Sequence, residues 1–175
     1  MEGTKLLADA LGRIKGGLER ALTGVSLEEL HRLPQSDCNS IAWLAWHLTR
    51  VQDDHISSLA SREQAWTDEG WHTRFGLEPD PSNVGWGHTP EQVAAFRSPD
   101  AQTLLDYHAA VMKRSTGYLA TLGPADLGRV LNEPQWATSV TVGVRLVSVV
   151  NDGTEHMGQI NYLRGLFQGL GWQRR

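Results

Sequence analysis

Two side chains near the end of the chain have the type and spacing of metal ligands. Asp152 and His156 lie four residues apart in the segment NDGTEHMGQ, residues 151–159. On an α-helix this spacing places both side chains on one face, one turn apart, so both can reach a single ion. A carboxylate and an imidazole suit zinc, and nickel, iron or manganese are alternatives. The pair therefore predicts part of a divalent-metal site whose remaining ligand comes from another element.

His47 is the candidate for that remaining ligand, because it falls between Leu44 and Val51 on the buried edge of a predicted helix. Three protein ligands that leave one position open are typical of a catalytic zinc site. A plainer interpretation stays open for each residue. An Asp–His pair at this spacing also forms local salt links, and a histidine on an apolar stripe is commonly a core residue.

Apolar residues that recur every three or four positions predict the helices that must position these side chains. We expect four long helices, over residues 3–22, about 40–60, from Ser98-Pro99-Asp100 to Gly123-Pro124, and about 139–168. The start of the last helix is ambiguous, because Val140, Val142 and Val144 alternate as they would in a strand. A single strand without a partner is unstable, so we interpret this segment as helix throughout.

Residues 62–98 are rich in Gly, Pro, Trp and Asp and predict a long irregular crossover between helices two and three. Thr89-Pro90-Glu91-Gln92 has the pattern that caps one short helix within it, and Ser26 to Glu29 caps another short helix earlier in the chain. The fold predicted is an all-α four-helix bundle that forms a single domain over residues 1–175.

Composition narrows the classes of function. The net charge of -4 and the pI near 5.9 argue against nucleic acid as a partner, because phosphate-binding proteins usually present a basic face. No apolar run approaches the roughly 20 residues of a membrane span, and the charged N-terminus does not resemble a signal peptide. Cys38 is the only cysteine, which excludes an internal disulfide. We expect a cytoplasmic protein that contacts neither nucleic acid nor membrane.

Three stretches, residues 39–56, 85–99 and 141–166, resemble the DinB/YfiT-like superfamily of bacterial metal-binding four-helix bundles. Within it they are most similar to the branch of mycothiol and bacillithiol S-transferases. The resemblance implies that a histidine of helix two and an [H/E/D]-x-x-x-H pair of helix four hold the metal, roles that fall on His47, Asp152 and His156. Many members have histidine where Asp152 stands, which leaves the identity of the metal open.

The resemblance also implies an activity, a metal-dependent thiol S-transferase. Such an enzyme joins a low-molecular-weight thiol co-substrate, mycothiol or a similar compound, to a small-molecule electrophile in detoxification. Zn²⁺ would lower the pKa of a coordinated thiol. Two alternatives stay open, namely another metal-dependent enzyme such as a hydrolase, and a non-catalytic metal-binding stress-response protein. Relatives are often dimers, and the glycine-rich first helix could pack closely against a second copy, so a homodimer is one option.

The sequence offers further residues around the predicted site, each with two interpretations, and assigns no catalytic group. Gln159 either orients a group next to the metal or forms a helix contact. His55 and Arg164 either contact the thiol co-substrate or lie on solvated parts of their helices. His108 either approaches the metal or is a core histidine that hydrogen-bonds a neighbouring helix. The tryptophans of the crossover either line a pocket over the metal or hold the loop in place.

Overall fold

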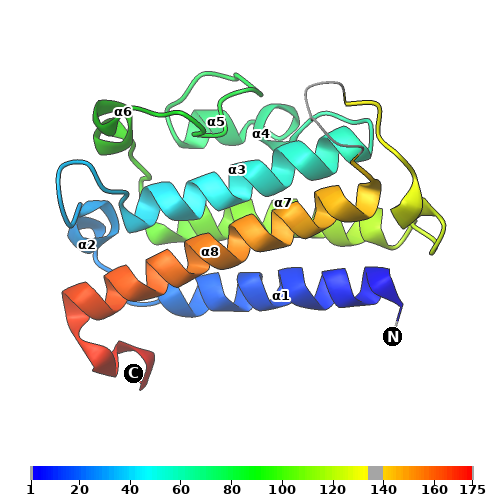
Figure 1. The fold of residues 1–175 in the computed structure, drawn as a ribbon. Coiled ribbons are helices and arrows are strands. Elements are labelled where there is room, and N and C mark those ends of the chain that lie inside the picture. Colours follow the sequence, from blue (N-terminus) through cyan, green and yellow to red (C-terminus); the bar gives the residue numbers. More distant parts are fainter. Residues whose placement is uncertain (1, 134–139, 175) are drawn as a thin grey trace.

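Four long helices lie side by side and form the body of the molecule (Figure 1). The computed structural model describes residues 2–133 and 140–174. The long helices are α1 (Gly3–Leu22), α3 (Ile41–Leu59), α7 (Ala101–Leu119) and α8 (Val142–Gln168). Helix α8 packs against α1 and α3, and α7 packs against the same two helices from the opposite side. The predicted all-α four-helix bundle is confirmed.

The core lies along the common axis of the four helices, and each helix supplies its apolar stripe to it. Leu18, Leu44, Val111 and Ile160 are examples of buried side chains, one from each long helix. Burying one such side chain stabilises the fold by roughly 1.5–3 kcal/mol, which compensates for the glycines that weaken α1 as an isolated helix.

The crossover between α3 and α7 lies over the outer side of α3 in Figure 1 and contains three short helices. The predicted one is α6 (Pro90–Ala95), whose capping box joins Thr89 and Gln92. Two single-turn helices, α4 (Ala65–Asp68) and α5 (Trp71–Arg74), were not expected, because four residues carry no readable periodicity. The other predicted capping box starts α2 (Leu27–His31) before the crossover.

Helix α7 begins two residues later than the Ser98-Pro99 pattern predicts. Its N-cap is Asp100, whose Oδ1 accepts a hydrogen bond from the Thr103 backbone N–H at 2.7 Å. The Ser98 hydroxyl instead donates to the Asp100 carbonyl. The helix ends at Leu119, before Gly123, and the 3₁₀ helix η1 (Asp126–Gly128) follows.

The prediction of helix throughout the last element is wrong at its start. Thr141 is extended and forms an isolated antiparallel bridge with Val130, in which Leu131 N–H donates to the Val140 carbonyl at 2.8 Å. The residue before the helix therefore does have a partner after η1, whereas Val142 and Val144 lie in α8. Thr141 caps α8, which begins at Val142, whereas Ser139 lies outside the described residues.

The 3₁₀ helix η2 (Leu170–Arg174) follows α8. None of the described helices is long and apolar enough to cross a membrane.

Candidate metal centre

Helices α3 and α8 pack against each other and bring the three predicted ligands together at one place in their interface. One potential ligand atom from each of His47, Asp152 and His156 lies within 4.8 Å of the others. His156 Nε2 is 3.4 Å from Asp152 Oδ1, and His47 Nε2 is 3.9 Å from the same oxygen. These distances place two imidazole nitrogens and a carboxylate around a common point that could hold a metal ion.

Both histidines direct the same nitrogen toward that point, because the other ring nitrogen is already engaged. His47 Nδ1 hydrogen-bonds the backbone carbonyl of Val84. His156 Nδ1 hydrogen-bonds Gln159 Oε1 at 2.9 Å. Since each partner is an oxygen that can only accept, each Nδ1 carries a proton, and in the neutral imidazole each Nε2 therefore has its lone pair available. Oxygen acceptors hold metal-binding histidines in this way, and Gln159 makes such a contact with His156.

The second carboxylate oxygen of Asp152 has no partner among the described residues. Asp152 Oδ2 is buried and accepts no hydrogen bond there. An unsatisfied buried acceptor costs about 1–3 kcal/mol, and more when it is charged. A cation between the two histidines would remove this cost, so the donor set fits the metal that the sequence predicts.

Exposure and proton affinity differ across the cluster. The side chain of His47 is 5% exposed, whereas those of His156 and Asp152 are 15% and 25% exposed. Burial lowers the pKa of His47, which keeps it neutral and able to donate its lone pair. Burial also acts to lower the pKa of His156, but its hydrogen bonds to Asp152 and Gln159 outweigh burial and raise it. The cluster is therefore closed on the α3 side and more open on the α8 side.

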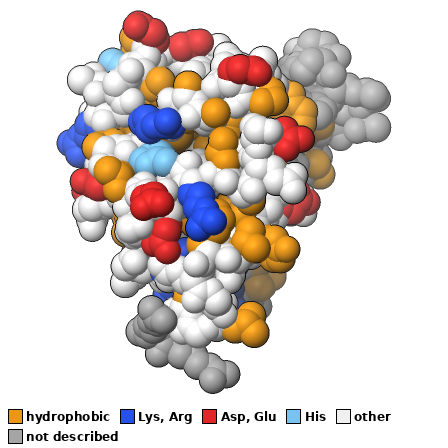
Figure 2. Space-filling view, turned by 90° about the vertical axis from the view of Figure 1, so that its left-hand side faces the viewer, with side chains coloured by type: hydrophobic (Ala, Val, Ile, Leu, Met, Phe, Trp, Pro, Cys, Tyr) orange, Lys and Arg blue, Asp and Glu red, His pale blue; other side chains and the backbone are white. Residues whose placement is uncertain are grey.

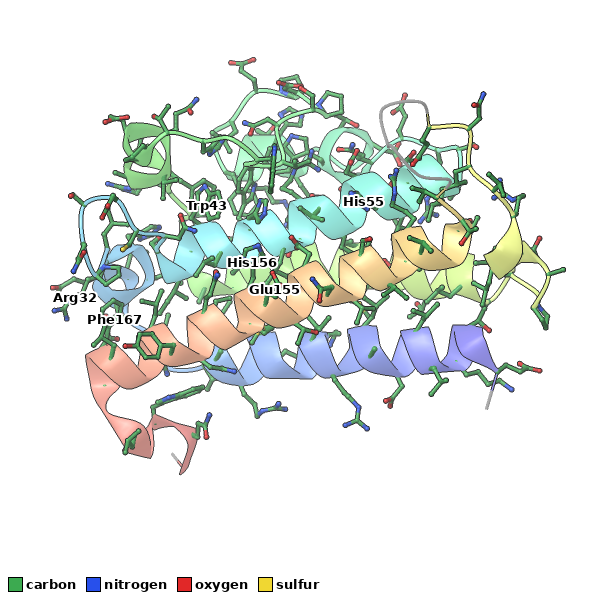
Figure 3. The ribbon with its side chains drawn as sticks, in the orientation of Figure 1. Arg32, Trp43, His55, Glu155, His156 and Phe167 are labelled. Atoms are coloured by element: carbon green, nitrogen blue, oxygen red, sulfur yellow. The ribbon has the colours of Figure 1, made fainter. Side chains whose placement is uncertain are left out.

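The ring of His47 is held between Trp43 and the crossover. The Trp43 and His47 rings stack with centroids 4.7 Å apart and an angle of 12°. On the crossover, Gly85 has a φ of +89°, and a Cβ there would lie 2.8 Å from the Trp46 ring and 3.0 Å from His47 Nδ1. Only glycine allows this close approach, which brings the Val84 carbonyl to His47. Figure 3 shows Trp43 on the crossover side of α3 and His156 on α8.

The crossover is itself held by a buried polar cluster that the sequence did not reveal. Arg50, one turn beyond His47 on α3, is fully buried. Its guanidinium donates to Gln64 Oε1 at 2.7 Å and to the Pro81 and Asn83 carbonyls at 2.9 and 3.1 Å, all within the crossover. Its Nη1 donates to the Tyr107 hydroxyl at 3.2 Å. Every guanidinium nitrogen has an acceptor, and the loop before Val84 is fixed in place.

Asp53 balances the charge of Arg50 and is equally well satisfied. It accepts hydrogen bonds from the backbone N–H groups of Ala65 and Trp66, both at 2.9 Å, and from the Tyr107 hydroxyl at 2.9 Å. Burial raises the pKa of Tyr107 well above its usual value, so the phenol stays protonated and donates to Asp53. The one sequence signal is an Arg–Asp pair, three residues apart, on the buried side of an apolar helix.

The remaining predicted residues do not join the three ligands. His55 lies eight residues further along α3 (Figure 3), and burial and the nearby charge of Arg145 lower its pKa. Arg164 is buried at the far end of α8, where it donates to the Thr23 carbonyl. His108 is buried in α7 and pairs with the Thr49 hydroxyl at 3.1 Å, as expected for a core histidine. Glu155 is exposed on α8 and bonds Asn151.

Comparison with known proteins identifies the family of the chain. The model of the DinB superfamily matches residues 11–160. This chain belongs to the DinB superfamily. A crystal structure of a conserved protein from Enterococcus faecalis has the same fold, with a TM-score of 0.86 and 32% sequence identity over 95% of this chain and 97% of that one. A search of curated proteins gave no match. The DinB fold and its candidate metal centre thus agree with the resemblance in the sequence.

Proposed function

We propose that this DinB protein binds one divalent ion, Zn²⁺, through His47, Asp152 and His156, and joins a low-molecular-weight thiol to electrophiles. One observation supports metal binding most strongly. Asp152 buries a carboxylate oxygen without a partner, next to two histidines whose Nε2 lone pairs point toward the same place. A salt link between His156 and Asp152 would account for Asp152 Oδ1 but not for the buried Oδ2 that has no partner among the described residues.

The donor set supports zinc and a reactive site. Two imidazole nitrogens and one carboxylate oxygen are ligands that zinc commonly takes, and three protein ligands leave a coordination position open. When bound, zinc lowers the pKa of a thiol in that position, which makes the thiolate available at neutral pH. The thiol would approach from the α8 side, because Asp152 and His156 are more exposed than His47.

The protein's own residues orient the ligands and exclude water from one side. His47 is fixed by Trp43 and by the Val84 carbonyl, and His156 is fixed by Gln159. This preorganisation keeps both Nε2 atoms in place before a substrate arrives, as rigid supporting contacts do in metal sites generally.

The surroundings of the cluster favour a nucleophile supplied by a co-substrate over hydrolysis by an activated water. A hydrolase of this kind needs a general base next to the water. The acidic neighbour on α8, Glu155, is exposed and hydrogen-bonded to Asn151. Among the described residues, only His47, Asp152 and His156 gather as a possible metal-binding group, and all three are used as ligands.

A thermal-shift experiment tests the thiol activity. Zinc-loaded protein is heated with mycothiol, bacillithiol, glutathione or coenzyme A, and the protein without zinc is heated in parallel. We expect one thiol to raise the Tm of the zinc form alone, because a ligand that binds only the native site stabilises it. The same thiol should then be conjugated to a model electrophile. No Tm shift and no conjugation with any of these thiols would contradict the transferase proposal, even if zinc is bound.

A further inference from the structure

A cavity lies at the C-terminal end of α8, beyond the metal centre. It encloses about 580 Å³ between the end of α1, the last turns of α8 and η2. In Figure 1 this end of the molecule is where η2 folds back below α8 toward α1. Its lining includes Arg20, Asn161, Arg164, Gln168 and Trp172. None of the three metal ligands belongs to this cavity.

Arg164 lines the cavity with a guanidinium whose hydrogen-bonding capacity is mostly unused. The residue is only 3% exposed. Its Nη2 donates to the Thr23 carbonyl at 3.0 Å, which satisfies one carbonyl at the end of α1. Its Nε and Nη1 are buried and have no acceptor among the described residues. Such a buried cation is costly, because neither nitrogen recovers the hydrogen bonds that it made to water.

The nearest carboxylate does not satisfy Arg164. Both oxygens of Glu29 accept hydrogen bonds from Gln168 Nε2 at 2.9 Å, so Glu29 acts on Arg164 only through its charge. Burial lowers the pKa of Arg164, which is the direction expected for a cation that lacks a close counter-ion. Gln168, and not Arg164, is thus the hydrogen-bond partner of Glu29 at this end of α8.

The rest of the lining suits an anion with a flat apolar part. Arg20 adds a second positive charge, and no acidic residue is among the described residues that line the cavity. Asn161 and Gln168 offer amide groups, and Trp172 offers a ring whose centroid is 5.2 Å from the Arg164 guanidinium carbon. The surface at this end carries charges of both signs, with hydrophobic side chains between them (Figure 2).

We propose that this cavity binds a small-molecule oxyanion, a carboxylate or a phosphate monoester, whose oxygens accept hydrogen bonds from Arg164 and whose charge is also neutralised by Arg20. Guanidinium groups bind both oxyanions well, because the donors of their planar fork match the oxygen positions. An aromatic or other flat group on the ligand would lie against Trp172. Two arginines and no acid among the described lining residues favour an anion here over a neutral ligand.

Calorimetric titration tests the proposal, with benzoate and phenyl phosphate as probes at constant ionic strength. Benzyl alcohol is the neutral control. We expect at least one anion to bind, and Arg20→Gln and Arg164→Lys to weaken it at least tenfold. The tighter of the two anions shows whether the site prefers a carboxylate or a phosphate. Arg13→Gln changes an exposed arginine of α1 that pairs with Asp9, and it should bind the probe like the wild type.

The oxyanion site should bind its ligand independently of the metal centre. His47→Ala protein should bind the same anion with unchanged affinity, so this result is independent of the proposed thiol transferase. If Arg164→Lys does not fold, the Arg20→Gln variant, at an exposed position, still tests whether the cavity binds the anion. The proposal is overturned if neither anion binds, if benzyl alcohol binds equally well, or if Arg20→Gln binds like the wild type. In each case Arg164 serves only to cap α1.

Discussion

Two buried polar clusters lie one turn apart on α3, and they differ in how fully their hydrogen bonds are made. Around Arg50, every guanidinium nitrogen has an acceptor, and both carboxylate oxygens of Asp53 accept from neighbours. Around His47, the Nε2 atoms of His47 and His156 face the carboxylate of Asp152, whose buried Oδ2 has no partner among the described residues. The hydrogen bonds of the Arg50 cluster are complete in the folded chain, whereas the His47 cluster retains an unsatisfied acceptor that a metal ion would occupy.

The difference in hydrogen bonding assigns a structural role to the Arg50 cluster and a functional role to the His47 cluster. The two clusters are also connected. A saturated buried network fixes geometry, whereas an unsaturated one costs stability and is retained when it binds a ligand. The Arg50 cluster holds the crossover residues that precede Val84, and the Val84 carbonyl orients His47. The complete cluster therefore supports the incomplete one.

The largest expected effect follows from breaking the complete cluster. Arg50→Met leaves Asp53 buried without its counter-ion, so we expect a loss of about 3–5 kcal/mol in the free energy of unfolding. Urea unfolding with and without zinc measures it, and the loss should appear in both conditions. Arg13→Met, at an exposed position, is the control. A loss below about 1 kcal/mol would show that the cluster does not hold the fold.

The fold was predictable from the sequence, but the contacts that hold the metal ligands in place were not. Helix periodicity and capping patterns sufficed for the long helices and for α2 and α6, and the spacing of Asp152 and His156 indicated one half of the site. His47 depended on the family resemblance, because only tertiary packing brings α3 to α8. The Arg50 cluster and the Val84 carbonyl were missed, since backbone acceptors in an irregular loop leave no trace in residue types. The predicted start of α8 was wrong because Thr141, just before the helix, pairs with Val130 in an irregular segment.

A pH experiment sharpens the comparison with a third buried group, His108. Burial lowers its pKa to about 4, from an ordinary value of 6.5, so the unfolded chain takes up a proton that the folded chain does not. The stability from neutral His108 is complete above about pH 6.5 and decreases until about pH 4, by up to about 3 kcal/mol. His108→Gln in zinc-free protein should lose less stability than the wild type between pH 7 and 4.5, measured by urea unfolding. Equal losses would contradict a buried neutral His108.

The link between the two clusters is tested at Gly85. Gly85→Ala places a Cβ against Trp46 and His47, so the Val84 carbonyl must move away, and we expect zinc affinity to fall about 10–100-fold. Gly87→Ala is a matched control, because Gly87 also has a positive φ, of +78°, but a Cβ there meets nothing within 4 Å. Competition with a zinc-binding dye measures both affinities. Equal losses in the two variants would attribute the effect to backbone strain alone.

The smallest expected change in stability has the opposite sign to that of Arg50→Met. Asp152→Asn removes a partly buried charge whose Oδ2 has no partner among the described residues, so zinc-free protein should become more stable by about 1 kcal/mol at pH 8. The same variant should bind zinc far more weakly, because it loses the anionic ligand. Thermal unfolding with and without zinc separates the two effects. Marked destabilisation of the zinc-free variant would mean that Asp152 is a structural residue like Asp53.

The metal content of the protein tests the central claim most directly. Protein purified without a histidine tag and without chelator is measured by elemental analysis, together with His47→Ala. We expect about one zinc per chain in the wild type, and close to none in His47→Ala, whose helical circular-dichroism spectrum should be unchanged. A wild-type chain that binds no divalent ion, even after incubation with zinc, or a His47→Ala variant that keeps its full metal content, would contradict this assignment of the ligands.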